Sequence, residues 1–223
     1  MKKFKLILCI LFTLSNFNIL KSAEQIDPIK VDWSFKGLLG KFDRASLQRG
    51  FQVYKEVCAS CHSMQYLSYR NLGEPGGPEF SKEEVKAIAA SFDVTDGPDA
   101  QGEMFTRPGK PSDKFVNPYP NVNAATAANG GAYPPDMSVL VKARKGGANY
   151  IYSVLVGYED PPAGVILDEG VYYNKYMIGN NIKMPNNLSD GLVDYADGTE
   201  ATVDQMAKDV TTFLSWAAEP ELE

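Results

Sequence analysis

Apolar residues recur at helical spacing in the segment that follows Asp43. Four of them are separated by four, three and four positions: Leu47, Phe51, Tyr54 and Cys58. This spacing places them on one face of a helix. The pattern therefore predicts a helix that carries the chain into a pair of cysteines.

Two further helices are predicted from capping boxes, in which two side chains three positions apart accept hydrogen bonds from free backbone N–H groups at a helix start. Ser81 and Glu84 form one such pair. The apolar face of the helix that follows consists of Val85, Ile88, Ala89 and Phe92. Thr202 and Gln205 form the other, and Pro220 ends that helix. Its apolar stripe consists of Val203, Met206, Ala207, Val210, Phe213, Leu214 and Ala217.

The remaining segments predict short helices joined by long loops. The run Met137–Lys145, before Gly146-Gly147, predicts one helix, and Tyr150–Val156, before Gly157, predicts another. Residues 93–135 contain seven prolines and five glycines without a sustained period. So long a connection is either a surface insertion or a functional loop that wraps over something large. The predicted fold class is mainly α with long loop insertions.

The first 23 residues have the layout of a secretory signal peptide. Three lysines precede an apolar run over residues 6–14, and small residues stand at positions 22 and 23. The run is well short of the roughly twenty residues needed to span a bilayer, which disfavours a membrane anchor. We expect an exported chain with one main domain over residues 24–223.

Charge narrows the classes of partner. The formal net charge is −6, and removing residues 1–23 takes away four lysines and no acid, which gives −10. Such an acidic protein is a poor ligand for nucleic acid and a better one for a basic protein.

The candidate chemistry lies in the motif Cys58-Ala59-Ser60-Cys61-His62. Two thiols three positions apart can each bond to one vinyl group of the same porphyrin, and the next residue can bind its iron through a neutral imidazole. A disulfide or a thioredoxin-like pair needs no adjacent histidine, and a zinc site needs about four ligands. His62 is the only histidine of the chain, so the motif predicts one covalently bound haem c.

The sixth iron ligand has to come from another segment, and without a second histidine a methionine thioether is the usual choice. Met177 and Met184 lie in candidate loops, whereas the other mature methionines are too close to His62, in the long loop or on predicted helices. Met184 is favoured because it precedes Pro185 in an asparagine-rich loop.

Four stretches resemble the cytochrome c1 family in order and spacing over roughly residues 31–221. They are Arg49–Met64 (RGFQVYKEVCASCHSM), Tyr69–Leu72 (YRNL), Tyr133–Arg144 (YPPDMSVLVKAR) and Tyr195–Glu221 (YADGTEATVDQMAKDVTTFLSWAAEPE). The resemblance implies a cytochrome c fold in which Cys58 and Cys61 hold one haem c and His62 and Met184 ligate its iron.

The family also implies a role and a place. It implies a redox subunit of the quinol-cytochrome c reductase (bc1) complex, which accepts one electron from the Rieske iron-sulfur protein and passes it to a c-type cytochrome. No quinol chemistry is expected on this chain. Cytochrome b is the other expected partner, on the periplasmic or intermembrane-space side of an energy-transducing membrane.

This sequence departs from the family at three places. Thr126 stands where relatives commonly have an arginine that pairs with a haem propionate, and Asn186-Asn187 replace a proline-rich turn. The family's membrane anchor would follow the segment that ends this sequence. Two other functions stay open at this point: a free soluble monohaem cytochrome of another pathway, and a haem-free redox or metal protein with a cysteine pair.

Overall fold

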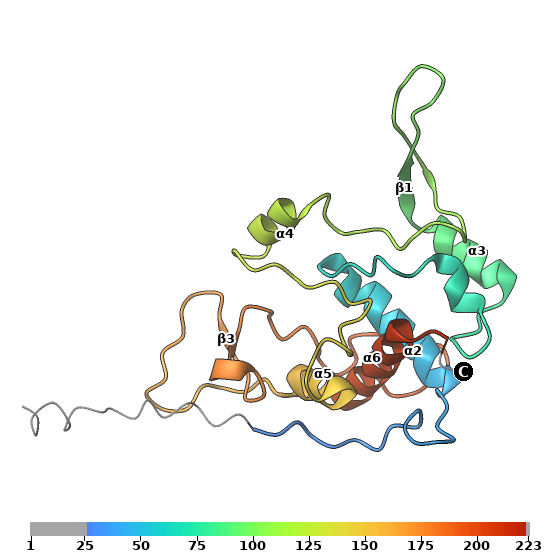
Figure 1. Cartoon of the computed structure of the whole chain (residues 1–223). Coiled ribbons are helices and arrows are strands. Elements are labelled where there is room, and N and C mark those ends of the chain that lie inside the picture. Colours follow the sequence, from blue (N-terminus) through green and yellow to red (C-terminus); the bar gives the residue numbers. More distant parts are fainter. Residues whose placement is uncertain (1–25, 222–223) are drawn as a thin grey trace, which may run out of the picture.

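The computed structural model describes residues 26–221, and it is mainly helical (Figure 1). The predicted signal peptide lies outside the described residues. The α-helices are α2 (Arg44–Glu56), α3 (Lys82–Ala90), α4 (Val122–Ala128), α5 (Gly147–Val156) and α6 (Val203–Ala218). Two antiparallel strand pairs complete it, β1 (Asp93–Asp96) with β2 (Phe105–Pro108) and β3 (Tyr172–Tyr173) with β4 (Asn181–Ile182). No helix among residues 26–221 is long and apolar enough to cross a bilayer.

The core is centred on α2 and α6, which cross at close range. The contact requires glycine at position 50 of α2, because a Cβ added to Gly50 would lie 2.1 Å from the carbonyl oxygen of Asp209. The rings of Phe51 and Tyr54 lie 5.7 and 5.8 Å from the ring of Phe213, which is fully buried. The aromatic pattern predicted from the sequence therefore forms the contact between the first and last helices.

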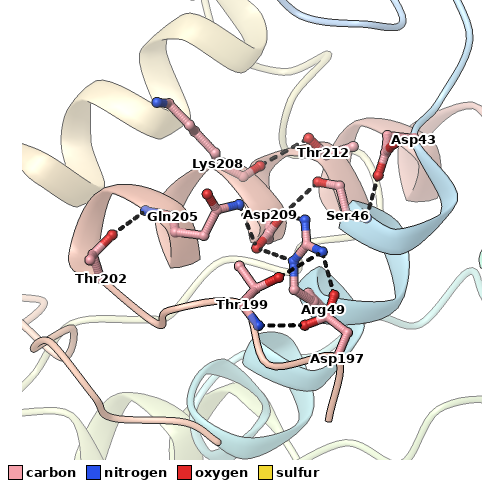
Figure 2. Close-up of polar contacts among 10 residues, drawn as sticks. All are labelled: Asp43, Ser46, Arg49, Asp197, Thr199, Thr202, Gln205, Lys208, Asp209 and Thr212. Carbon is pink, nitrogen blue, oxygen red and sulfur yellow. Dashed lines mark hydrogen bonds and ion pairs between the residues drawn. The ribbon is translucent and has the colours of Figure 1, made fainter. Parts of the chain in front are cut away.

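A buried carboxylate joins the two helices by charge as well as by packing (Figure 2). Asp209 has no exposed surface, and it accepts hydrogen bonds from Ser46 Oγ at 2.7 Å and Arg49 Nε at 2.9 Å. Arg49 also donates to Asp197 at 2.7 Å, so its guanidinium is shared between two acids. Such multiply bonded, desolvated pairs fix register, because a shift would leave a charge buried and unpaired.

The two predicted capping boxes have different outcomes. At α3 the box is complete: Ser81 Oγ accepts from the Glu84 N–H, and the Glu84 carboxylate accepts from the Ser81 N–H. At α6 only Thr202 caps, by accepting from the Gln205 N–H at 3.1 Å. The Gln205 side chain instead donates through Nε2 to Asp209 at 3.0 Å, which gives the buried carboxylate a further hydrogen-bond partner.

The helix predicted over Met137–Lys145 is wrong. The segment is a succession of turns, and the next helix, α5, begins earlier than expected, at Gly147. Within residues 137–145 the Leu140 N–H reaches back only three residues, to Met137, and the Ala143 N–H reaches Leu140 and Val139, so no continuous helical series of hydrogen bonds forms. The predicted end of α5 at Gly157 is confirmed.

The long segment 93–135 has more structure than its composition predicted. Strands β1 and β2 form a hairpin that projects from the body of the molecule (Figure 1). Its base is braced by Arg107, which donates to Asp96 at 2.5 Å and to Asp113 at 2.6 Å. After the hairpin the chain runs into α4, whose first N–H groups are capped by Asn121.

Candidate haem site

The first cysteine of the motif begins a 3₁₀ turn, Cys58–Ser60, one residue after α2, and Cys61 is the residue that ends this turn. The N–H groups of Cys61 and His62 both donate to the Cys58 carbonyl, at 3.1 and 2.9 Å, which makes the turn tight. Neither thiol forms a disulfide. Burial raises the pKa of the Cys58 thiol to about 12, so the sulfur stays protonated at neutral pH. A thiolate redox pair or metal site is disfavoured by that environment.

The imidazole of His62 is buried and held by one hydrogen bond. Its Nδ1 lies 2.8 Å from the carbonyl oxygen of Pro135. A carbonyl can only accept, so Nδ1 carries the proton and Nε2 keeps its lone pair. Burial also lowers the pKa of His62, which favours the neutral ring. A neutral, oriented imidazole with one nitrogen free is the form that binds haem iron.

Asp136 fixes the carbonyl that orients His62. Its carboxylate accepts hydrogen bonds from Ser63 Oγ at 2.7 Å, from the Gln65 N–H at 3.0 Å and from the Ser138 N–H at 2.9 Å. Asp136, the residue after Pro135, is thus bound to Ser63 and Gln65, which follow His62. These bonds hold the Pro135 carbonyl next to the imidazole. Sequence reasoning assigned Asp136 no role, although its position after two prolines, which lack N–H donors, was a signal for an irregular, side-chain-bonded segment.

A cavity of about 240 Å³ opens beside Cys61. Its wall includes Ser63, Tyr133 and Pro134, together with the chain that runs from Asn117 into α4. No charged side chain lines it within the described part of the chain. A wall that mixes prolines, tyrosines and uncharged polar side chains next to the second cysteine offers a porphyrin apolar contacts without a buried charge. The alternative in which residues 93–135 are only a surface insertion is therefore disfavoured for their second half.

The two candidate methionines have different surroundings. Both are partly buried against the core. Met177 Sδ accepts a hydrogen bond from Tyr150 OH at 3.1 Å. Met184 is held through its backbone, since its carbonyl accepts from Tyr158 OH at 2.9 Å, and its sulfur has no hydrogen-bond partner among residues 26–221. A sulfur that is free while its backbone is fixed is the better metal ligand.

The segment carrying Met184 meets the segment that follows α4. Lys183 Nζ donates to the Gly130 carbonyl at 2.8 Å. In Figure 1, α4 and the β3 region lie above and below the end of α2 at which the motif begins. His62 is hydrogen-bonded to Pro135, and Lys183, the neighbour of Met184, is hydrogen-bonded to Gly130. The short stretch 130–135 therefore connects the segment of His62 with the segment of Met184. The four predicted site residues are Cys58, Cys61, His62 and Met184.

Comparison with known proteins decides the family. The family model described as "Cytochrome C1 family" matches residues 33–223.

The chain belongs to the cytochrome c1 family.

Cytochromes c1 from plants, bacteria and fungi are similar to it over most of its length. The mitochondrial heme protein cytochrome c1-2 of Solanum tuberosum is 57% identical over 191 residues, which are 86% of this chain and 72% of the potato protein. Cytochrome c1 of Rhodospirillum rubrum is 50% identical over 210 residues, 87% of this chain and 76% of the relative. The yeast mitochondrial heme protein is 54% identical over 190 residues, 85% and 60% respectively.

Membership in the cytochrome c1 family confirms the resemblance inferred from the sequence. It also confirms haem as the cofactor, since members from potato and yeast are named heme proteins. The alternative of a haem-free protein with a cysteine pair is therefore wrong. Within the described residues no group of three or more histidine, cysteine or acidic side chains could hold a separate metal ion.

Proposed function

We propose that this cytochrome c1 is the electron-transfer haem subunit of a quinol-cytochrome c reductase, taking one electron from a Rieske iron-sulfur protein and passing it to a c-type cytochrome. The observation that carries the proposal is the motif Cys58-x-x-Cys61-His62 with its buried histidine oriented by Pro135. A relative from Candida albicans, 52% identical, is named a catalytic subunit of the mitochondrial cytochrome b-c1 complex.

Four side chains hold the cofactor in this proposal. Cys58 and Cys61 would hold the haem through thioether bonds, and His62 Nε2 and Met184 Sδ would bind its iron. The bound haem supplies reversible one-electron chemistry at its iron. The chain supplies a neutral imidazole of fixed orientation, a thioether that favours ferrous iron, and a cavity wall without charged side chains.

The partners follow from the same role. Cytochrome b and the Rieske protein would carry the quinol chemistry, because this chain offers no acid–base constellation for it. The subunit would act on the periplasmic or intermembrane-space side of an energy-transducing membrane, which accords with the predicted signal peptide. A free soluble cytochrome of another pathway is the alternative.

Isolation under mild conditions separates these two functions. From membranes of the source cells, the haem protein should purify together with a cytochrome b and a Rieske protein, and added quinol should reduce its haem. A quinone-site inhibitor should abolish that reduction without changing reduction by dithionite. A protein that purifies alone, and whose haem quinol does not reduce in the presence of the membrane fraction, contradicts the proposal.

The acceptor is expected to be basic, since acidic side chains gather on α3 and the β1–β2 hairpin. The sequence points to six: Glu83, Glu84, Asp93, Asp96, Asp99 and Glu103. Their field is weaker than this number suggests, because Arg107 neutralises Asp96. Steering by the rest should make the association rate with a basic cytochrome fall steeply as ionic strength rises from roughly 10 to 200 mM. A rate that stays flat would rule out steering and leave an apolar docking patch.

A further inference from the structure

Lys183 links the methionine loop to the end of α4. Its Nζ donates to the Gly130 carbonyl at 2.8 Å, and no carboxylate of the described residues lies within ion-pair distance of it. Gly130 lies one turn beyond Thr126, because the next residue, Gly131, donates its N–H to the Thr126 carbonyl at 2.9 Å. The ammonium group of Lys183 therefore stands beside the last turn of α4.

A haem bound in this region would be stabilised by a positive charge near its propionates. A haem carries two propionates, which are ionised at neutral pH, and the cavity wall beside Cys61 contains no lysine or arginine. Thr126 on α4 offers only a hydroxyl group. Two other cations are already paired with carboxylates: Lys175 with Glu159 at 3.0 Å, and Arg107 with two aspartates.

We propose that Lys183 supplies the cation that faces a haem propionate, a role for which Thr126 has no charge. The inference rests on the proposed function, because it takes Met184 as the iron ligand. Lys183 is the residue directly before Met184, so its side chain leaves the same loop that approaches the iron. Its side chain is long and flexible, so the ammonium group can leave the Gly130 carbonyl for a propionate or bond to both. The propionate carboxylate is the stronger acceptor of the two.

A second role for the same contact is a helix cap. A lysine near the C-terminus of a helix can bond to the last carbonyl groups and interact favourably with the helix dipole. For a helix of seven residues such as α4 this would affect local stability. It would leave the electron affinity of the iron nearly unchanged, so a measurement of reduction potential separates the two roles.

The test uses the haem-loaded protein and its midpoint potential. Replacing Lys183 by Gln should lower the potential, because a nearby positive charge disfavours the oxidised, more positive iron. Lys183→Arg should leave the potential unchanged. Lys175→Gln is the matched control, since it removes a half-buried lysine of a nearby position that already pairs with Glu159. The shift for Lys183→Gln should shrink at high salt, because Lys183 is exposed.

A second variant moves the charge to α4. Thr126→Arg should change the potential little in the wild-type protein, where Lys183 is present, and should restore it in the Lys183→Gln background. The far-red absorption band of a methionine-ligated ferric haem reports on Met184 throughout, and it should stay intact in every variant.

Two outcomes would overturn the inference. One is an unchanged potential in Lys183→Gln with an intact far-red band, which would leave the lysine as a cap of α4. The other is a lowered potential that accompanies loss of the band, since the lysine would then act by holding Met184. If the wild-type protein itself lacks bound haem or the band, the proposed site fails first, and the two failures are thereby distinguished.

Discussion

The contact between α2 and α6 and the segments around the haem motif are built differently. Between the two helices, Gly50 and Phe213 leave no free space, and the buried Asp209 has its hydrogen bonds satisfied by the chain itself. Around the motif, the contacts are hydrogen bonds to loop carbonyls, a cavity stands beside Cys61, and Met184 is only partly buried. The difference indicates that the region around α2 and α6 packs without the cofactor, whereas the segments around the motif need the haem to fill their core.

Removing the covalent attachment of the haem should have the largest effect on the difference between these two regions. In a Cys58→Ala, Cys61→Ala variant no thioether can form, so haem should be lost on denaturing electrophoresis. Backbone amides of residues 113–135 and 158–190 should then exchange at rates close to those of mobile loops, while the interior amides of α2 and α6 keep most of their protection. Ser60→Ala, an exposed change in the same turn, should alter neither. Equal loss of protection in both regions would contradict the division.

Removing one axial ligand should have the next largest effect. Met184→Leu should lower the midpoint potential by on the order of 0.1 V or more, within the roughly 0.8 V that axial ligands span. It should also open the iron to carbon monoxide. Met177→Leu should do neither, because that sulfur is bonded to Tyr150. Redox titration and carbon monoxide difference spectra measure both, and the reverse result would exchange the roles of the two methionines.

The region around α2 and α6 is tested at its buried charge. Asp209→Ala leaves Arg49 without its buried partner and should lower the free energy of unfolding by about 3–5 kcal/mol. Glu159→Gln, which breaks the exposed pair with Lys175, should cost less than about 1 kcal/mol. Denaturant titration of the haem-loaded proteins gives both values. If Asp209→Ala does not fold, the double change Arg49→Met, Asp209→Leu should recover folding, and failure there would mean that the pair is needed for more than charge balance.

The smallest effect is expected at the base of the hairpin. Arg107 lowers the pKa of Asp113 to about 2, below the roughly 3.9 of an unfolded chain. A depressed pKa stabilises the folded state above the unfolded value, and this contribution is lost as pH falls toward 2. Asp113→Asn should therefore be slightly less stable than wild type at pH 5, and the gap should narrow by pH 3. A gap that is constant across this range would assign the effect to the hydrogen bond with the Lys110 N–H alone.

Local patterns predicted α2, α3, the end of α5 and α6, but they missed α4 and placed a helix over residues 137–145 where the structure has turns. The spacing of Leu47, Phe51 and Tyr54 and the Ser81 cap depend on neighbouring residues, so both could be read from the sequence. The turns after Asp136 could not, because their hydrogen-bond partners at Ser63 and Gln65 lie some seventy positions away. For the same reason the motif alone predicted the haem-binding roles of the cysteines and His62. The contacts of the Pro135 carbonyl and of Lys183 could not be predicted, because they join segments that are far apart in the sequence.

The environment of Cys58 has a consequence for the order of assembly. In the folded chain this thiol is protonated, and its own carbonyl holds the N–H groups of the next cysteine and of the histidine. A bulky planar ring would have to reach both sulfurs of a turn that is already closed. Biogenesis should therefore attach the cofactor to an extended chain, so that the cysteines meet the vinyl groups before the first and last helices close.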